Sequence, residues 1–247
     1  MSTITPGTGS PYRFRELWDR KPALRAIYSD IYRRMLDVTV PGAILEIGGG
    51  SGNFKSFAPQ AISTDIVTAP WLDLVCDAQR LPFATGSFSN IVMVDVLHHV
   101  EHPIHALTEA ARVLRAGGRL IFCEPAITPL SGVFYRHFHP EPVDMSADPL
   151  AVGAVTPEKD PWHSNQAIPT LLVDRYRTAM AQVVPQFTLV RVERFSFFAY
   201  PLSGGFRPWS LLPRRAAGPL LAAEWSLRTL LGRFIAFRLL AIYDRKA

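Results

Sequence analysis

The sequence predicts an α/β protein in which a mostly parallel, doubly wound sheet carries helices on both faces. Apolar runs typical of buried strands alternate with stretches of helical periodicity between residues 40 and 125. The first of these runs leads directly into a glycine-rich turn at residues 48–52. In a chain of 247 residues, a hydrophobic content of 48% supplies a sizeable core and argues against disorder.

The glycine-rich turn holds Gly48, Gly50 and Gly52 at alternate positions, with Gly49 between them. Glycine allows a backbone to bend sharply, to adopt positive φ and to approach a ligand closely. Ligands of open α/β sheets bind at the carboxyl ends of the strands. We therefore expect a cofactor-binding loop here, although glycine clusters also mark ordinary turns.

The remaining elements of the first half follow in order. A helix is expected after Pro22, where apolar residues recur at helical spacing up to Met35. Three further strand-like runs end near Asp65, Asp77 and Asp95. A helix over 103–115, ended by Gly117 and Gly118, precedes a strand over 119–124.

The second half is less regular. Residues 125–165 are rich in proline and histidine and show no sustained periodicity, so we expect a lid over the site. A helix over about 168–183, an extended run over 187–200 and a strand within 234–243 follow. An insertion at 201–232 carries a helix over about 219–231, in which Glu224 and Arg228 are expected to form a solvated pair.

Five motifs occur in a fixed order. They are Glu46-x-Gly48-x-Gly50-x-Gly52, Asp65, Asp77-Ala78 before Leu81-Pro82-Phe83, Asp95-x-Leu97-His98-His99, and Arg112-Val113-Leu114-Arg115-x-Gly117-Gly118. Over roughly residues 40 to 125 this series resembles the class I S-adenosylmethionine-dependent methyltransferases. The series looks most like their small-molecule branch, of the methyltransferase type 11 kind.

The resemblance implies a Rossmann-like, doubly wound sheet of seven strands, mostly parallel with an antiparallel last strand. It also implies S-adenosyl-L-methionine as cofactor and S-adenosyl-L-homocysteine as product. The loop of Gly48, Gly49, Gly50 and Gly52 would pass under the methionine part, with Glu46 organising the loop and the methionyl amine. Asp65 would bind the ribose and Asp77 with the Ala78 amide would read the adenine, while Asp95 and Leu97 would lie beside the sulfonium.

The chain departs from that family pattern in its spacing. Asp65 follows Gly52 closely, and Asp77 follows Asp65 closely, so the helices after the first two strands must be short or absent. Pro59 and Pro70 agree with this because each ends a helical turn early. The adenine side of the site is therefore expected to be open.

We expect one methyltransferase domain over residues 1–247. It divides into an N-terminal helical cap (1–39), a cofactor-binding core (40–124), the lid insertion (125–165) and the C-terminal half of the sheet (166–247) with its 201–232 insertion.

Histidines are the expected catalytic bases. Methyl transfer from a sulfonium needs aligned reactants and exclusion of water, and it requires no metal. A hydroxyl acceptor must lose its proton, for which histidine is suited. His98 and His99 follow the fourth strand and His139 lies in the lid; the structural alternative is that they cap a helix or stabilise the lid. Cys76 and Cys123 lack zinc-ligand spacing and are expected to be buried thiols, so no metal site is predicted.

The expected reaction is methyl transfer to a hydroxyl of a small or lipid-like metabolite, such as a natural product, glycan or glycolipid intermediate. A formal charge of +5 leaves an RNA methyltransferase as an alternative, and a non-catalytic S-adenosylmethionine-binding partner subunit is another. No nucleic-acid module is evident, so nucleic acid is not favoured.

The expected location is cytoplasmic, since residues 1–11 carry no apolar export segment. Tryptophan and arginine in 201–232 also suit peripheral contact with a membrane. The oligomeric state is left open.

Overall fold

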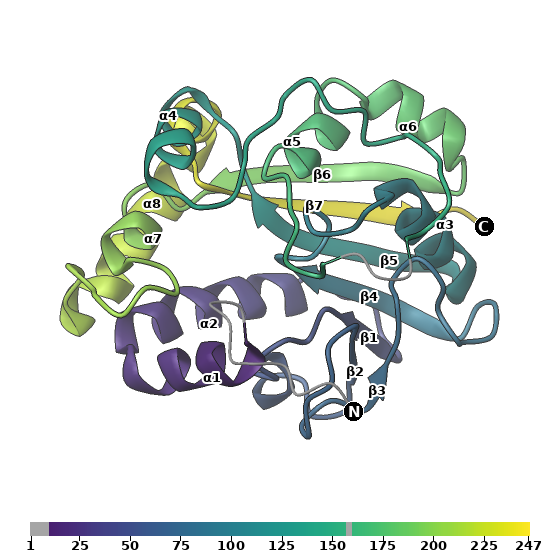
Figure 1. Ribbon diagram of the computed structural model, residues 1–247, viewed down its shortest axis with the longest axis horizontal. Coiled ribbons are helices and arrows are strands. Elements are labelled where there is room, and N and C mark those ends of the chain that lie inside the picture. The colour runs from purple at the N-terminus through teal and green to yellow at the C-terminus, as the bar shows by residue number, and fades with distance from the viewer. Residues whose placement is uncertain (1–9, 157–159) are drawn as a thin grey trace.

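The computed structural model describes residues 10–156 and 160–247. Seven strands form one sheet in the order β3-β2-β1-β4-β5-β7-β6 (Figure 1). The strands are β1 (Ile44–Ile47), β2 (Ile62–Asp65), β3 (Leu74–Val75), β4 (Phe88–Val94), β5 (Leu114–Pro125), β6 (Phe187–Phe195) and β7 (Arg238–Arg245). The expectation about an export segment concerns residues that lie almost wholly outside the described part.

The first five strands are parallel, whereas β7 runs antiparallel to both β5 and β6. This arrangement confirms the predicted fold class. β7 therefore begins at the edge of the sheet where β4 and β5 end. That edge is the one at which ligands bind in open α/β sheets.

Helices cover both faces of the sheet (Figure 1). They are α1 (Pro11–Arg20), α2 (Pro22–Leu36), α3 (Pro103–Val113), α4 (Pro129–Phe138), α5 (Ile168–Val173), α6 (Arg177–Val183), α7 (Ala199–Ser203) and α8 (Arg214–Ile235), with one 3₁₀ turn, η1 (Phe54–Ser56).

The alternation of side chains along the strands divides the core in two. Ile91 and Met93 of β4 pack with α3, α5 and α6, whereas Val92 faces α1, α2, α7 and α8. Phe122 and Cys123 of β5 separate in the same way. Both faces of these central strands are buried, which explains why their sequences are continuous apolar runs.

The expected short connections are present. A single 3₁₀ turn follows β1, and no helix lies between β2 and β3 in this fully described stretch. The loops on this side of the sheet are therefore thinner than helical crossovers would be.

Several element boundaries differ from expectation. The helix over 103–115 ends at Val113, and the strand begins at Leu114 rather than 119. Gly117 and Gly118 lie inside β5, where the β4 register shifts. A Cβ on Gly118 would stand 2.9 Å from the Ser89 carbonyl oxygen, so glycine here permits close strand approach instead of ending the helix.

The second half also contains more helix than expected. Residues 129–138 of the lid form α4, whose Thr128 and Ser131 make a capping box. The expected helix over 168–183 is two helices separated around Asp174. The extended run from 187 ends at Phe195, and α8 extends beyond 219–231 at both ends, so the last strand starts only at Arg238.

The expected Glu224–Arg228 pair is wrong. Glu224 is buried and accepts hydrogen bonds from the Phe198 and Ala199 amides, which begin α7. Arg228 instead pairs with Glu193 on β6 at 2.9 Å. The buried face of α8 can thus hold the Glu224 carboxylate, because this carboxylate accepts hydrogen bonds from the first amides of α7.

None of the described helices is both long enough and apolar enough to cross a membrane.

Candidate active site

The carboxyl edge of the sheet gathers the chemically reactive side chains. Asp95 follows β4 directly and has a φ of 58°. Glu124 is the penultimate residue of β5, and Arg238 is the first residue of the antiparallel β7 beside it. The glycine loop leaves β1 at the same edge.

The glycine loop has the backbone that the sequence predicts. Gly48, Gly50 and Gly52 all have positive φ. A Cβ on Gly48 would collide with the Val96 side chain, and one on Gly52 with the Trp71 indole. A Cβ on Gly50 would meet nothing closer than 3.8 Å. The loop therefore offers room for a ligand at Gly50.

Trp71 is a part of this loop region that the sequence did not single out. Its indole Nε1 donates to the Gly50 carbonyl at 2.8 Å. Helix α1 packs against Trp71: Tyr12 contacts the indole edge-on, and the Arg15 guanidinium lies 4.5 Å from the centre of the Trp71 ring. Arg15 also donates to the Ser51 carbonyl. The N-terminal helix thus holds the glycine loop from outside.

Two carboxylates support the loop from below. Asp65 accepts from the Gly50 and Val67 amides at 2.8 and 2.9 Å, which leaves acceptor capacity on both oxygens for ribose hydroxyls. Burial raises the pKa of Asp65. Glu46 is hydrogen-bonded to the Ser63 hydroxyl, and burial raises its pKa to about 7. A Cβ on Gly49 would press on both Ser63 and Glu46, so that glycine lets the loop lie against them.

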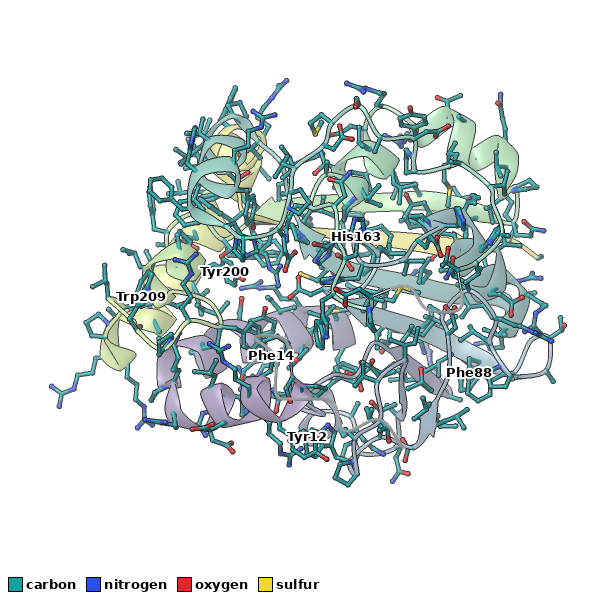
Figure 2. The ribbon with its side chains drawn as sticks, viewed as in Figure 1. Tyr12, Phe14, Phe88, His163, Tyr200 and Trp209 are labelled. Carbon is teal, nitrogen blue, oxygen red and sulfur yellow. The ribbon has the colours of Figure 1, made fainter. Side chains whose placement is uncertain are left out.

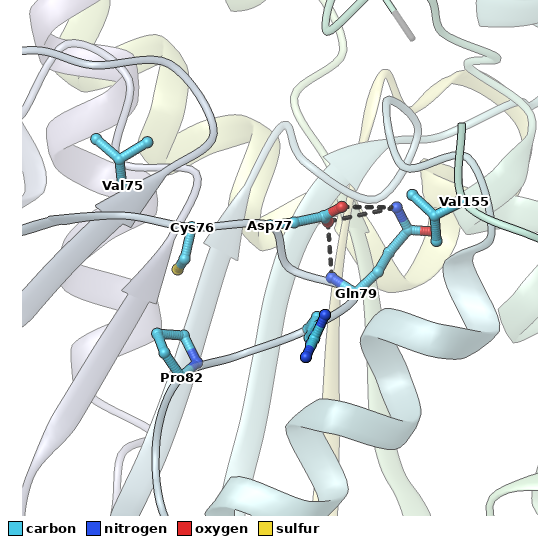
Figure 3. A pocket seen from close by; sticks show the side chains of 7 residues that line it. Val75, Cys76, Asp77, Gln79, Pro82 and Val155 are labelled. Carbon is cyan, nitrogen blue, oxygen red and sulfur yellow. Dashed lines mark hydrogen bonds between the residues drawn. The ribbon is translucent and has the colours of Figure 1, made fainter. Parts of the chain in front are cut away.

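A pocket of about 410 Å³ lies next to these residues at the end of β3 (Figure 3). Asp77 points toward it and accepts from the Gln79 amide at 2.8 Å and from the Gln79 side chain. Cys76 lines the pocket and is half-buried, so the expectation that both cysteines are buried holds only for Cys123. Ala78 is buried beside it. The size and polarity of the pocket suit a nucleoside base, with Asp77 and the backbone at its edge.

Glu124 organises the turn after β4. Its Oε1 accepts from the amides of Val96 and Leu97, at 2.7 and 2.9 Å. Its Oε2 lies 2.6 Å from His98 Nδ1. The Leu97 side chain is fully buried in the core, so any contact it makes with a ligand comes from its backbone.

His98 lies between two carboxylates, since its Nε2 is 3.4 Å from Glu141 of the lid. Burial alone would lower the pKa of His98, but Glu124 and Glu141 raise it to about 10. The same contact lowers the pKa of Glu141 to about 2, against the effect of its burial. At neutral pH, His98 is therefore an imidazolium fixed between two carboxylates.

His99 has the opposite charge state. Its ring lies 4.2 Å from that of His98. Burial, together with the positive charge on His98, lowers the pKa of His99 to about 4. His139 joins the cluster through Glu141, whose amide donates to its Nδ1 at 3.3 Å, and burial lowers its pKa as well. The structure thus brings His98, His99 and His139 together, the first charged and the other two neutral.

Asp95 and Arg238 form an ion pair beside this cluster. The guanidinium grips both oxygens of Asp95, with Nη2–Oδ2 at 2.6 Å, and Tyr28 of α2 donates to the same carboxylate at 2.8 Å. Burial would raise the pKa of Asp95, but Arg238 lowers it. Tyr200 covers the guanidinium with its ring.

An aromatic cluster joins side chains from three separate parts of the chain, of which Figure 2 labels Phe14. Phe14 of α1 lies 5.8 Å from Trp162 of the lid and 4.7 Å from Phe206 of the 201–232 insertion. Phe206 also packs against the ring of Tyr28. Trp162 contacts His99 edge-on, with 6.5 Å between the ring centres. We call Phe14, Trp162 and Phe206 the aromatic cover. It supplies an apolar wall next to the neutral His99.

Among the described residues, two trios could by spacing hold a metal ion: His98, His99 and Glu141, or Asp95, His98 and Glu124. His98 is common to both, and each of its ring nitrogens already faces a carboxylate. A metal ion would have to displace the two ring protons through which His98 contacts Glu124 and Glu141. The geometry therefore fits a protonated His98 between two carboxylates better than a metal site.

Several residues of this region were not predicted as site residues from the sequence, among them Glu124, Arg238, Trp71 and Trp162. A signal existed for the first two, because Glu124 is a carboxylate at the end of a buried strand and Arg238 interrupts an apolar run. Trp71 and Trp162 lie in irregular segments, where no pattern indicates which way a side chain points.

Comparison with known proteins finds similarity over the part of the chain that carries the glycine loop. Residues 45–122 match a family model described as a methyltransferase domain. A demethylmenaquinone methyltransferase of Tropheryma whipplei is 27% identical over 178 residues, which cover 61% of this chain and 74% of the relative. One from Mycolicibacterium vanbaalenii is 37% identical over 89 residues, covering 35% of this chain and 36% of the relative. A ubiquinone/menaquinone biosynthesis C-methyltransferase of Bordetella parapertussis is 31% identical over 102 residues, covering 33% of this chain and 40% of the relative.

Solved structures are similar over nearly the whole chain. A SAM-dependent methyltransferase of Thermotoga maritima superposes with a TM-score of 0.59 at 18% identity, covering 94% of each chain. One from Archaeoglobus fulgidus gives a TM-score of 0.54 at 14% identity, covering 90% of this chain and 94% of that one. At such identities the likeness is evidence for the fold alone, and it extends that evidence beyond residues 45–122.

Proposed function

Because this chain is an S-adenosyl-L-methionine-dependent methyltransferase with the class I fold, we propose that it methylates a small, hydroxylated aromatic acceptor of the quinol type. The observation that carries the proposal is the neutral His99 between the charged His98 and Trp162. A neutral imidazole accepts a proton, and the aromatic cover offers an apolar face to a flat ring.

The cofactor would lie across the glycine loop, over Gly50. Asp65 would accept from the ribose hydroxyls, and Asp77 with the Ala78 amide would hold the adenine edge in the 410 Å³ pocket. Bound there, S-adenosyl-L-methionine supplies a methyl group already activated by the positive charge on sulfur. Glu46 and Trp71 keep the loop in position beneath it.

The chain's own residues align the acceptor and manage its proton. Oxygen methylation releases the hydroxyl proton, whereas carbon methylation releases a ring C–H proton after the new bond has formed. His99 is placed to accept either one. His98 stays protonated and so fixes Glu141 and Glu124 around the acceptor side, and the aromatic cover keeps water out.

The identity of the accepting atom is part of the proposal. A hydroxyl oxygen was expected from the sequence, but the relatives are named for quinone pathways, and that of Bordetella parapertussis is named as a C-methyltransferase. We therefore favour the ring carbon beside a hydroxyl, because loss of the hydroxyl proton makes that carbon electron-rich. The apolar surroundings of His99 support an aromatic acceptor with either atom.

The test combines binding with turnover. Calorimetry with S-adenosyl-L-homocysteine first establishes the donor site, and a reduced naphthohydroquinone bearing a short isoprenoid chain then serves as acceptor, with NMR locating the new methyl group. His99→Ala should lower kcat by about 10²- to 10⁴-fold without changing the binding of S-adenosyl-L-homocysteine. His137→Ala, at an exposed lid histidine, is the matched control and should keep full activity.

Two results would contradict the proposal. Full kcat in His99→Ala would show that His99 is not the base. Tight binding of S-adenosyl-L-homocysteine without methylation of any hydroxylated aromatic compound would show that the proposed acceptor class is wrong and that the donor site is correct.

A further inference from the structure

Helices α4 and α8 contact one another and expose large apolar side chains to solvent. Leu230 is 67% exposed and Phe138 is 61% exposed. The exposed apolar residues of the two helices are Leu130, Val133, Phe138, Leu227, Leu230 and Phe234. Figure 1 shows both helices, with α7, at one end of the molecule. We call these six residues the apolar end.

The spacing along α8 shows that this exposure is systematic. Leu227, Leu230 and Phe234 fall three and four positions apart, so they lie on one side of the helix. A different side of the helix is buried through Ala217, Leu221 and Glu224. A helix that buries one face and still presents a second apolar stripe to water has a surface suited to another apolar phase.

The charge of this region is of one sign. Residues 196–237 contain five arginines and one acidic residue, Glu224, which is buried. Residues 129–138 add Arg136 and contain no acidic residue. Arg214, Arg215 and Arg233 are exposed, and within the described chain none of them forms an ion pair with a carboxylate.

We propose that the apolar end docks on the surface of an anionic lipid bilayer, with leucine and phenylalanine side chains among the acyl chains and arginines at the head groups. Apolar insertion and attraction to anionic lipid act together at such a surface. Charge complementarity selects the bilayer over a second copy of this chain, because two copies would bring the same arginines face to face.

Packed side chains connect the apolar end to the site. Phe134 of α4 packs against Phe237, next to Arg238, and Tyr135 packs against His139. The 201–232 segment that leads into α8 also supplies Phe206 to the aromatic cover. If the acceptor is the lipophilic quinol proposed above, it would enter from the membrane at this end; that clause alone rests on the proposed function.

The test is cosedimentation of the full chain with vesicles of phosphatidylcholine, with and without phosphatidylglycerol. Binding is expected with phosphatidylglycerol only, and it should weaken as salt is raised. Leu230→Glu with Phe234→Glu should weaken it by more than about tenfold. Arg136→Gln with Arg233→Gln, at the exposed arginines near Phe138 and Phe234, should weaken it by about 30-fold. Val183→Glu is the control, because Val183 has a similar exposed fraction on α6, away from the apolar end.

The outcomes separate this proposal from the proposed function, because vesicle binding needs neither cofactor nor acceptor. Absence of binding to phosphatidylglycerol vesicles, or equal weakening by Val183→Glu, would overturn it. So would a concentration-dependent dimer in sedimentation that the Leu230/Phe234 variant abolishes, since the apolar end would then be a contact between copies of this chain.

Discussion

Arg238 and Asp95 are 143 positions apart in the sequence, yet they form a two-pronged ion pair at the carboxyl edge of the sheet, with N–O distances of 2.5 and 2.6 Å. The guanidinium is 1% exposed. The pair joins the end of β4 to the start of β7. It therefore attaches the turn after β4, which contains His98 and His99, to the first residue of β7.

Breaking this pair should be costly. Arg238→Gln would leave the partly buried Asp95 charge without its ionic partner, so the free energy of unfolding should fall by about 3 kcal/mol in urea denaturation, the lower end for a buried pair. Arg119→Gln, which removes a partly exposed pair with Asp244, should cost less than about 1 kcal/mol. Equal losses in the two variants would contradict the structural importance assigned to the interior pair.

The glycine loop allows a matched comparison. Gly50 and Gly86 both have positive φ and open space where a side-chain methyl group would stand, so alanine at either should cost about 1–2 kcal/mol of stability from backbone strain. Only Gly50→Ala should also weaken S-adenosyl-L-homocysteine binding, by more than about tenfold, because only there would the methyl group meet the ligand. Urea denaturation measures the stability, and calorimetry measures the affinity for S-adenosyl-L-homocysteine. Unchanged affinity in Gly50→Ala would show that the ligand does not lie over Gly50.

Asp77 can be tested through the chemistry of the base. Losing a charged hydrogen bond to the adenine amino group should weaken S-adenosyl-L-homocysteine binding in Asp77→Ala by about 10- to 150-fold. The inosine analogue, which lacks that amino group, should bind wild-type protein weakly and should bind the variant no worse. Asp73→Ala, at an exposed carboxylate paired with Lys55, is the control. A full preference for adenine in Asp77→Ala would show that another group reads the base.

The two histidines should add no transition to the pH profile near neutrality. His99 is neutral above its pKa of about 4 and His98 remains protonated below its pKa of about 10, so between about pH 5 and 9 a transition in kcat is expected from Glu46, whose pKa is about 7, and not from either histidine. Steady-state rates across that range provide the measurement. A transition near pH 6.5 that persists in Glu46→Gln would mean that neither histidine feels the environment described here.

The same shifts have opposite effects on folding. His98 has a raised pKa, so its stabilisation is complete below about pH 6.5 and is lost as the pH rises through about 10. His99 has a lowered pKa, so its contribution is present above about pH 6.5 and is lost as the pH falls through about 4.

The sequence was sufficient for the parts of the structure that depend on local pattern. The mostly parallel sheet, the positive-φ glycines and the strand that ends at Asp65 all follow from short motifs. Helix α4 was missed because its buried positions are Ser131, Gly132 and Tyr135, which leave no apolar periodicity. Its Thr128 cap and Pro129 were nevertheless visible as a helix start.

Long-range partners could not be predicted. Glu224 looked solvated because Arg228 is four positions away, but the amides of α7 provide its real partners. His98 and His99 looked equivalent in the sequence. Their different charge states arise from Glu124 and Glu141, which come from a distant strand and from the lid.

The aromatic cover has a consequence for redesign of this protein. Phe14 is separated from Trp162 in the chain by the entire cofactor-binding core, and Trp162 is separated from Phe206 by β6 and three short helices. If the aromatic cover borders the acceptor as proposed, acceptor selectivity depends on all three of these segments. A chimera that imports only the lid of a relative would bring one third of a mutually fitted surface, and the other two segments would have to be exchanged with it.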